Sequence, residues 1–503
     1  PPSESSKRYL AVPSDAFSFF KTLGLTSLAG FAGVASAAPD QSKQAIKQVN
    51  ADVVIIGAGT AGLVAAIRAK DLGANVVLLE KADRPDGNSI YALGTLAAWG
   101  TRNQKEAGIQ DSRDAFYKDM MKVSAGRADP NLTATYADNI TEGVEWLQDE
   151  IGVKFGKLSM TPWPRLGRGH RVTGDGIPGG AQLIKLLLAA AEKRNIPIYY
   201  EHKAVQLLTG PKGEVIGVKA LTNAGYVDFY AKGGVLIASG GFSANPEMTD
   251  KYIGGWASRL TLRGSRNTTG ENVSLALPLF AKMVNMDQFH AGPIVSETHV
   301  NPADVLNMMQ GIIVGTNGKR FMDEQNTYVI KAKTTAEKTI ENKAFAIIDS
   351  NCRVIDKVIP KFDRLNSPYG KANTIEELAK EIDVPVDELK KSVDSFNKAV
   401  DSGELSKLTP PNSYKKPQKI EKAPFYAVPY SGGMTATFGG PLINSKAEVQ
   451  NLERKTIPGL YAAGNAAGGL FFRDYIGGSQ LGGATVFGTI AAREMVKRAK
   501  ESK

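Results

Sequence analysis

Short apolar runs, a glycine-rich turn and a helical pattern follow one another from residue 51 onward. Ala51 to Ile56 is rich in β-branched residues, as expected for a strand buried in a parallel sheet. The turn GAGTAG then leads into the helical stretch LVAAIRAKDLG, and Asn75 to Leu79 forms a second apolar run. This order of strand, turn, helix and strand predicts a βαβ unit and an α/β fold.

Similar patterns recur further along the chain. Gly234 to Gly241 (GVLIASGG) and Ile457 to Gly464 (IPGLYAAG) each predict an apolar strand that ends in a glycine turn. Between them, Thr374 to Phe396 has the spacing of two amphipathic helices, with the segment DVPVD at 383–387 as the break and helix start.

A different kind of segment precedes the first strand. Leu23 to Ala38 is mostly apolar or small, and residues 35–37 (ASA) fit a signal-peptide cleavage site. The run is too short and too rich in Gly and Ala for a stable membrane span. It resembles the end of a twin-arginine export signal, although Ala16 and Phe17 stand where the arginine pair belongs. We expect residues 1–48 to be a signal-like segment and linker of an exported protein, periplasmic or at the cell surface; the alternative is an apolar helix packed on the body of a cytoplasmic protein.

The glycine turn carries the first chemical signal. Gly57 makes the tight turn, Gly59 lets the backbone approach a pyrophosphate, and Gly62 allows close packing of helix on strand. The N-terminus of the helix presents free N–H groups and a positive dipole end to phosphates. Glu80, at the end of the second strand, is placed to accept hydrogen bonds from ribose hydroxyls. Together these features predict dinucleotide binding.

Composition narrows the function classes. The 503 residues call for two or more domains, and the net charge of +10 comes from scattered lysines without a nucleic-acid-binding signature. The single cysteine, Cys352, excludes an internal disulfide, a protein-held iron–sulfur cluster and c-type haem. The four histidines lack metal-ligand spacing, so we expect no metal site.

Motifs spread over the chain carry a family resemblance. From about Ala51 to Lys497 the sequence resembles the flavoprotein family of fumarate reductase, soluble flavocytochrome c, urocanate reductase and 3-ketosteroid dehydrogenase. No second complete GxGxxG accompanies the first, so a separate NAD(P)H domain is not expected. The similar segments are DGNS with ALG at 86–94, GHRVTG at 169–174, GGF with Asn245 and Met248, KRFMDE at 319–324, and LGGA with FG at 481–488.

The resemblance implies a Rossmann-like FAD-binding domain (residues 49–255 and 431–503) with an inserted α+β cap or substrate domain (256–430). It implies non-covalent FAD, with the active site where the cap meets the flavin. The cofactor-binding residues that it implies are Gly57, Gly59, Ala61, Gly62, Glu80, Lys81, Asn88, Ser89, Gly94, Ala204, Val205, Gly240, Gly241, Gly464, Asn465, Gly478, Gln480 and Leu481.

Departures from the fumarate reductase pattern are informative. Tyr328 stands where that pattern has a proton-delivering arginine, and Tyr475 where it has a carboxylate-binding arginine. The family's HPT segment is matched to 291–293 (AGP), without its histidine. A dicarboxylate would bring two charges to a site without matching cations, which is costly. We therefore predict that the chain is not a fumarate reductase.

Tyrosine at both positions resembles the 3-ketosteroid dehydrogenases. A phenol donates a hydrogen bond to an enone oxygen without bringing charge, and it can exchange a proton at carbon. Our hypothesis is that Tyr475, with the N–H of Gly478 or the hydroxyl of Ser479, polarises the substrate carbonyl. Tyr328 then transfers the proton, and hydride passes between the flavin and the β-carbon.

Alternatives stay open at each position. Both tyrosines could be packed aromatic residues. His170, Arg473 and Phe472 are the expected substrate contacts, but His170 fits a structural role equally well, and Arg473 could hold the carboxylate of a urocanate- or cinnamate-like acid. We expect an exported reductase of a neutral enone or 3-ketosteroid-like compound that exchanges electrons with a separate protein. The alternatives are a reductase of an unsaturated monocarboxylate, a ketosteroid dehydrogenase running in the oxidative direction, and a silent flavin or electron-transfer protein.

Overall fold

A parallel sheet lies at the centre of the larger part of the protein. The computed structural model describes residues 47–160 and 166–502, so almost all of the signal-like segment lies outside the described residues. The sheet order is β21-β22-β12-β2-β3-β8, parallel except for β21. The strands are β2 (Val53–Ile56), β3 (Val76–Leu79), β8 (Ile198–Tyr199), β12 (Val235–Ile237), β21 (Glu448–Gln450) and β22 (Thr456–Ala462).

The first predicted strand is divided in two. β2 contains only Val53–Ile56, whereas Ala51 ends β1 (Lys47–Ala51), which belongs to a second sheet. The break falls at Asp52, whose carboxylate accepts the backbone N–H of Asn75 at 2.8 Å. The second sheet has the order β1-β11-β10-β9, with β9 (Lys203–Thr209), β10 (Val215–Thr222) and β11 (Gly225–Ala231).

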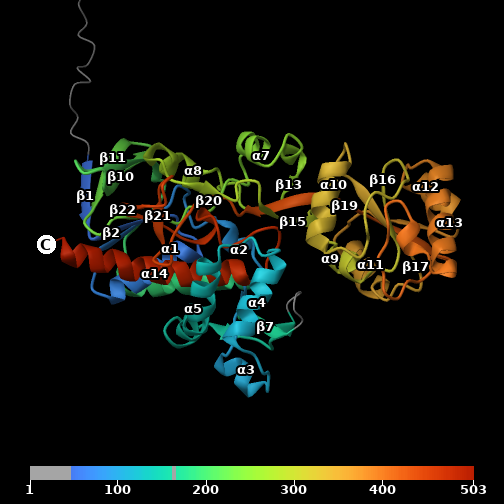
Figure 1. Cartoon of the computed structure of the whole chain (residues 1–503), viewed down its shortest axis with the longest axis horizontal. Coiled ribbons are helices and arrows are strands. Elements are labelled where there is room, and N and C mark those ends of the chain that lie inside the picture. Colours follow the sequence, from blue (N-terminus) through green and yellow to red (C-terminus); the bar gives the residue numbers. More distant parts are fainter. Residues whose placement is uncertain (1–46, 161–165, 503) are drawn as a thin grey trace, which may run out of the picture. The chain divides into compact units, whose positions relative to one another are not determined.

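Helices pack against the parallel sheet and against one another. α1 (Thr60–Asp71) contacts α14 (Ser479–Glu501) along its length, so the C-terminal helix lies beside the first βαβ unit (Figure 1). Every apolar residue of α1 is buried, since the helix lies between the sheet and its neighbours. The other helices of this part are α2 (Asn88–Tyr91), α3 (Arg102–Glu106), α4 (Arg113–Val123), α5 (Pro130–Asp149), α6 (Gly179–Lys193), α7 (Pro246–Tyr252) and α8 (Glu271–Ala276).

Several short strands complete this part. β7 (Gly167–Thr173) pairs with β4 (Thr95–Ala97), β5 (Lys154–Phe155) and β6 (Ser159–Met160). β14 (Met283–Val284) pairs with β20 (Gly440–Pro441). One-turn 3₁₀ segments occur at Ala257–Arg259, Leu277–Leu279, Leu405–Lys407 and Gly464–Ala466.

The inserted segment forms its own mixed sheet, which is coloured yellow to orange in Figure 1. Successive residues of β17 alternate between two hydrophobic cores, with Ala344, Ala346 and Ile348 in one and Phe345 and Ile347 in the other. The sheet contains β13 (Thr261–Leu262), β15 (Phe289–Ile294), β16 (Ile312–Gly315), β17 (Ala344–Asp349), β18 (Gly370–Ala372) and β19 (Phe425–Thr437). Its helices are α9 (Ala303–Met308), α10 (Tyr328–Lys338), α11 (Ile355–Arg364), α12 (Ile375–Glu381) and α13 (Val386–Ser402).

The predicted helix pair at 374–396 corresponds to α12 and α13. The Thr374 side chain caps α12 by accepting the N–H of Glu377, and the break falls between Glu381 and Val386. α13 continues to Ser402, where Gly403 ends it in a left-handed conformation.

One strand crosses the expected domain boundary at residue 430. The first half of β19, Phe425–Tyr430, pairs with β17, and the second half, Ser431–Thr437, pairs with β15. The described residues, 47–160 and 166–502, belong to one compact unit. The fold is an α/β FAD-binding type with an inserted cap, and the exact domain limits stay predictions.

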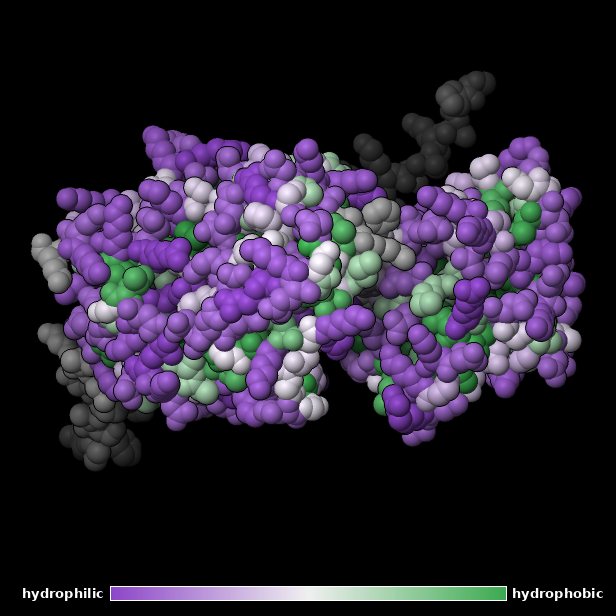
Figure 2. Space-filling model, turned by 90° about the horizontal axis from the view of Figure 1, so that it is seen from below, coloured by the Kyte–Doolittle hydropathy of each residue, from purple (hydrophilic) through white to green (hydrophobic). Residues whose placement is uncertain are grey.

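The surface of the described part is mostly polar. The face in Figure 2 is largely hydrophilic, with apolar residues in small separate groups. Among the described helices, none combines the length and apolar character that crossing a bilayer requires.

Candidate active site

A large cavity runs from the first βαβ unit to the cap segment. Its volume is about 1690 Å³, and its wall includes the turn after β2, the N-terminus of α14 and residues of α9 and α10. This volume exceeds the few hundred to about 1,000 Å³ of an ordinary ligand pocket. The cavity therefore has room for a dinucleotide and a substrate together.

The dinucleotide end of the cavity is formed by the GxGxxG turn. Gly57 has φ +105°, and a side chain there would meet the carbonyl of Ala238. A Cβ at Gly62 would overlap the carbonyl oxygen of Gly57, so this glycine lets α1 pack on the turn. A Cβ at Gly59 has nothing nearer than the Ser89 hydroxyl at 3.7 Å, which leaves the backbone open to the cavity. The N-terminus of α1 therefore faces a space that can accept a phosphate group.

Two charged residues follow β3 at the same end. The Glu80 carboxylate accepts the backbone N–H groups of Ala58 and Ala82, both at 3.0 Å. Burial raises the pKa of Glu80, and these two hydrogen bonds oppose the rise. Lys81 donates to Thr269 Oγ1 at 2.5 Å and to Glu271 Oε1 at 2.7 Å. Both side chains line the cavity, and each is held in place by its partners.

Most of the predicted cofactor-binding residues line this cavity. Gly62, Val205 and Gly241 do not: Gly62 packs under the turn, Val205 is 38% exposed, and the Cα of Gly241 faces the Thr437 hydroxyl. The predicted residues in the wall are Gly57, Gly59, Ala61, Glu80, Lys81, Asn88, Ser89, Gly94, Ala204, Gly240, Gly464, Asn465, Gly478, Gln480 and Leu481.

The two predicted tyrosines also line the cavity, although the chain brings them from distant segments. Tyr328 is the first residue of α10, whose N-terminus is capped by the Thr327 side chain, and Tyr475 precedes α14. Burial raises the pKa of both phenols, so both are neutral hydrogen-bond donors near neutral pH. This arrangement can deliver a proton and polarise an oxygen without a negative charge.

Among the cavity residues that were not predicted, Arg263 and His290 bear on the chemistry of the two tyrosines. Arg263 follows β13, and its Nη1 donates to Thr435 Oγ1 at 3.1 Å. Within the described ranges no carboxylate lies within 4.0 Å of its nitrogens, and burial lowers its pKa. The charge of the guanidinium acts on both phenols and opposes the rise that burial causes in their pKa values. The site therefore contains a cation, whereas the sequence comparison indicated that the matching cations had been lost.

His290 lies on β15 against Tyr475. The phenol oxygen is 3.2 Å from His290 Nδ1, and the two rings meet edge to face at 4.9 Å between centroids. Burial lowers the pKa of His290 well below its ordinary value, and the charge of Arg263 adds to this, so the ring is neutral. The sequence AGP at 291–293, which was matched to the HPT segment, lacks a histidine, but His290 directly precedes it and lies in the site.

The start of α14 is fixed by contact with β4. Gly478 has φ +99°, and a Cβ there would approach Ala97 N at 2.8 Å and Thr95 O at 3.0 Å. Ser479, the first helical residue, is fully buried and does not line the cavity. Its predicted role in polarising the substrate carbonyl therefore has no support from its position.

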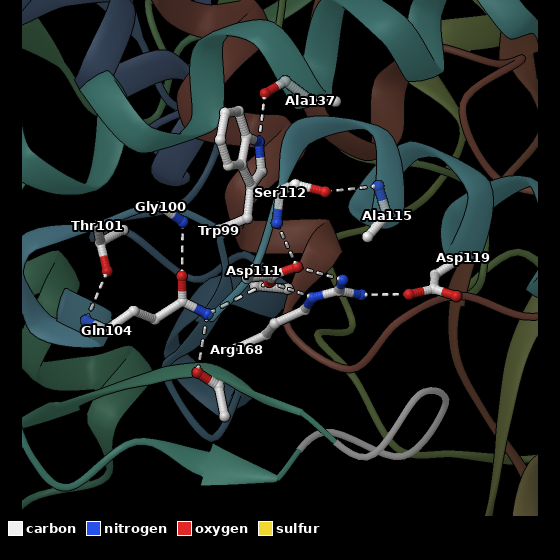
Figure 3. A network of polar contacts seen from close by, with 12 residues as sticks. Trp99, Gly100, Thr101, Gln104, Asp111, Ser112, Ala115, Asp119, Ala137 and Arg168 are labelled. Atoms are coloured by element: carbon white, nitrogen blue, oxygen red, sulfur yellow. Dashed lines mark hydrogen bonds and ion pairs between the residues drawn. The ribbon is translucent and has the colours of Figure 1, made fainter. Parts of the chain in front are cut away.

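A buried ion network supports β4 and its partner β7. Arg168 on β7 is fully buried and donates two hydrogen bonds to Asp111, at 2.6 and 2.7 Å, and one to Asp119 at 2.8 Å (Figure 3). Gln104 joins the same network through Asp111 and the carbonyl of Gly167 (Figure 3). Satisfied charges of this kind fix the geometry of the strands on which Gly478 rests.

The three predicted substrate contacts do not reach the cavity. His170 is fully buried, 2.7 Å from Thr101 Oγ1 and 2.8 Å from the carbonyl of Arg168, so both ring nitrogens have partners. Phe472 is buried under the Arg127 guanidinium, 4.0 Å from the ring centroid. Arg473 is exposed and has φ +64°. These positions favour structural roles for His170 and Phe472.

Comparison with known proteins identifies the family. The FAD binding domain model matches residues 52–486. The chain belongs to this FAD-binding family. The glycine turn, Glu80 and the size of the cavity fit FAD, which supplies hydride transfer when it is bound. The protein is a flavoprotein oxidoreductase of the group that acts on CH–CH bonds.

Several relatives cover most of this FAD-binding chain. A probable fumarate reductase of Shewanella frigidimarina is 31% identical over 450 residues, which is 89% of this chain and 75% of the relative. A urocanate reductase of Eggerthella lenta is 28% identical over 88% of this chain and 73% of its own. The structure of a 3-ketosteroid-Δ4-(5α)-dehydrogenase of Rhodococcus jostii, in complex with 4-androstene-3,17-dione, is 25% identical with a TM-score of 0.75, covering 91% of this chain and 99% of that chain.

Proposed function

We propose that the protein reduces a C=C bond conjugated to the single carboxylate of an unsaturated acid, of the urocanate or cinnamate type. The observation that carries this proposal is the position of Arg263 in the cavity wall. Its guanidinium lies in the cavity wall without an acidic partner among the described residues, and its charge acts on both phenols. A buried cation is stabilised when a bound ligand brings the opposite charge, and guanidinium binds carboxylate through two parallel hydrogen bonds.

The arginines of the cavity wall fit one carboxylate better than two. Among the described residues, the arginines in this wall are Arg263 and Arg171, and Arg171 is exposed to solvent. Tyr475 stands where the fumarate reductase pattern has a carboxylate-binding arginine, and Tyr328 where it has a proton-delivering one. Asp474 also lines the wall, and burial raises its pKa. A second carboxylate would therefore lack a second guanidinium partner among the described residues, and pairing of this kind is what offsets the cost of burying a charge.

The described residues divide the chemistry between them. Arg263 holds the carboxylate, and Tyr475, oriented by His290, donates a hydrogen bond to the oxygen on which negative charge develops. Tyr328 donates a proton to the carbon next to the carboxylate. Its raised pKa keeps the phenol protonated until negative charge develops on the substrate carbon.

A neutral enone of the 3-ketosteroid type is the second candidate. Two neutral phenols in one cavity favour it, because they can polarise a ketone without adding charge. The similarity to the ketosteroid dehydrogenase supports the same substrate class and leaves the oxidative direction open.

The test is anaerobic reoxidation of the reduced flavin. The FAD-loaded protein is reduced, and its absorbance is followed after addition of cinnamate, urocanate, methyl cinnamate, 4-androstene-3,17-dione or fumarate. Fastest reoxidation by a monocarboxylate supports the first proposal, and fastest reoxidation by the steroid or the ester supports the second. Rapid reoxidation by fumarate contradicts both, and a flavin that no compound reoxidises indicates a protein without this activity.

We also propose that the protein is exported and that it receives its electrons from a separate carrier protein. The segment Leu23–Ala38 supports export, and the single GxGxxG fingerprint supports electrons that come from another protein rather than from NAD(P)H bound to this chain. Fractionation of cells that express the full sequence tests the first point. Reduction of the bound flavin by NADH alone would contradict the second.

A further inference from the structure

Lys331 is a buried lysine one helical turn after Tyr328. It is 2% exposed and lines the same cavity as the phenol. Residues three positions apart on a helix are neighbours on its surface, so the two side chains of α10 lie on one face. The Lys331 Nζ donates to the carbonyl oxygen of Leu306 on α9.

The carboxylates closest to Lys331 are occupied by other partners. Glu324 accepts two hydrogen bonds from Arg320 and one from Asn412, and Asp323 accepts from Ser413. Among the described residues Lys331 forms no ion pair, and burial lowers its pKa to about 8. The charged and titratable groups on the elements around it include His290 on β15, Asp304 on α9, Tyr328, Lys333, Glu337 and Lys338 on α10, Lys361 on α11, Tyr430 on β19, and Arg320, Asp323, Glu324, Tyr414 and Lys415 in the connecting segments.

The cavity continues past Lys331 as a polar lobe of the cap. Asn307 and Gln310 line this lobe together with Asp304 and Lys361. The side-chain oxygen of Gln310 is buried without a partner among the described residues. This unpaired oxygen and the neighbouring polar side chains are hydrogen-bond partners for water, and a chain of water molecules can carry protons.

We propose that Lys331 returns the proton to Tyr328 after each turnover. The Tyr328 O–H bond breaks as its proton goes to the substrate carbon, which leaves a phenolate. An N–H bond of the Lys331 ammonium then breaks, and this proton passes to the phenolate oxygen within the cavity that both side chains line. The neutral amine takes a proton from solvent through the polar lobe. The inference rests on the proposed role of Tyr328 as proton donor, but not on which substrate is reduced.

The order of these steps gives a clear test. Tyr328 is already protonated before the first turnover, so a Lys331→Met holoenzyme should reoxidise its reduced flavin once at a rate within about threefold of wild type. Its steady-state turnover, with reduced methyl viologen as donor, should fall at least about tenfold because the phenolate is no longer protonated quickly. The probe is cinnamate or 4-androstene-3,17-dione, whichever reoxidises the flavin faster.

Matched variants separate the relay from a structural role. Lys331→Gln keeps a donor for the Leu306 carbonyl, and Lys331→Arg keeps the charge but does not release a proton near neutral pH. Both should be as slow as Lys331→Met in steady state. Lys333→Met, a change at another partly buried lysine of α10 outside the cavity wall, should behave as wild type.

The outcomes are distinguishable. Unchanged steady-state turnover in Lys331→Met or Lys331→Gln overturns the relay, and so does an equal loss in the first turnover or full activity of Lys331→Arg. If Tyr328→Phe is fully active, the proposed function loses its proton donor. If Tyr328→Phe is inactive while the Lys331 variants are normal, only the relay is wrong.

Discussion

The carboxylate-binding role of Arg263 can be tested by changing the charge of the protein and of the substrate separately. Arg263→Met keeps a long side chain between β15 and β19 and removes the guanidinium. The matched substrates are an unsaturated acid and its methyl ester, because the ester keeps the C=C bond and removes the negative charge. The measured quantity is kcat/KM for each substrate with each enzyme.

The size of the effect follows from the surroundings of Arg263. Removing one partner of a desolvated charge pair costs about 2–5 kcal/mol. The lower part of that range applies here, since the guanidinium is partly open to the cavity and also donates to Thr435. A loss of about 2–3 kcal/mol is a fall of about 30- to 150-fold in kcat/KM for the acid. For the ester, kcat/KM should stay within about threefold of the wild-type value.

Stability gives an independent control on the same variant. In the FAD-loaded protein without substrate, Arg263 has no acidic partner among the described residues, so its burial is a cost. Replacing it by an apolar side chain should leave the melting temperature unchanged or raise it. An equal loss for acid and ester, or a lower melting temperature, would refute the carboxylate-binding role and indicate that Arg263 holds β13 to β19.

Three further predictions concern other residues. Tyr328→Phe should keep its bound flavin and lose turnover by about 10²-fold or more, measured as kcat against flavin content; unchanged kcat would exclude the phenol as proton donor. Arg168→Met should leave Asp111 buried without its partner, which should lower the free energy of unfolding by about 3–5 kcal/mol and lower the melting temperature. Adding Asp111→Asn to the same chain should restore part of the lost melting temperature. An unchanged melting temperature in Arg168→Met would show that the network does not stabilise β7. Burial lowers the pKa of Lys333 from 10.5 to about 8. Between pH 8 and pH 10.5 the unfolded chain therefore binds more protons at this residue than the folded protein does. The contribution of Lys333 to the free energy of unfolding consequently rises as the pH rises through this range. Lys333→Met should be more stable than wild type below pH 8, with the gain lost by pH 10.5; a gain that does not vary with pH would contradict this assignment.

Local chemistry made the cofactor half of the site predictable from sequence. The strand, glycine turn, helix and Glu80 lie within one short stretch, and each has a fixed role in binding a dinucleotide. The two helices at 374–396 were predictable for the same reason, because their apolar spacing and their break are local. The division of the first strand at Asp52 was not, since it depends on pairing with β11.

The substrate half was harder because it depends on tertiary contacts. Arg263 lies in no recognised motif, and only the pairing of β13 with β19 places it in the cavity. His290 was overlooked because the HPT segment was matched one residue later. His170 lies in a recognised motif, yet its ring is buried between the Thr101 hydroxyl and the backbone carbonyl of Arg168. A one-residue shift or a change of side-chain direction decides such cases, and neither is visible in a sequence.

The unbroken course of β19 has a consequence for protein engineering. Arg263, His290 and Tyr328 all belong to the inserted segment, whereas Tyr475 belongs to the returning part of the FAD-binding domain. A chimera that exchanges this insertion with a relative should therefore transfer most of the substrate preference in one step. Its second junction belongs after Thr437 rather than at residue 430, because a seam in the middle of β19 would join two halves that pair with different strands.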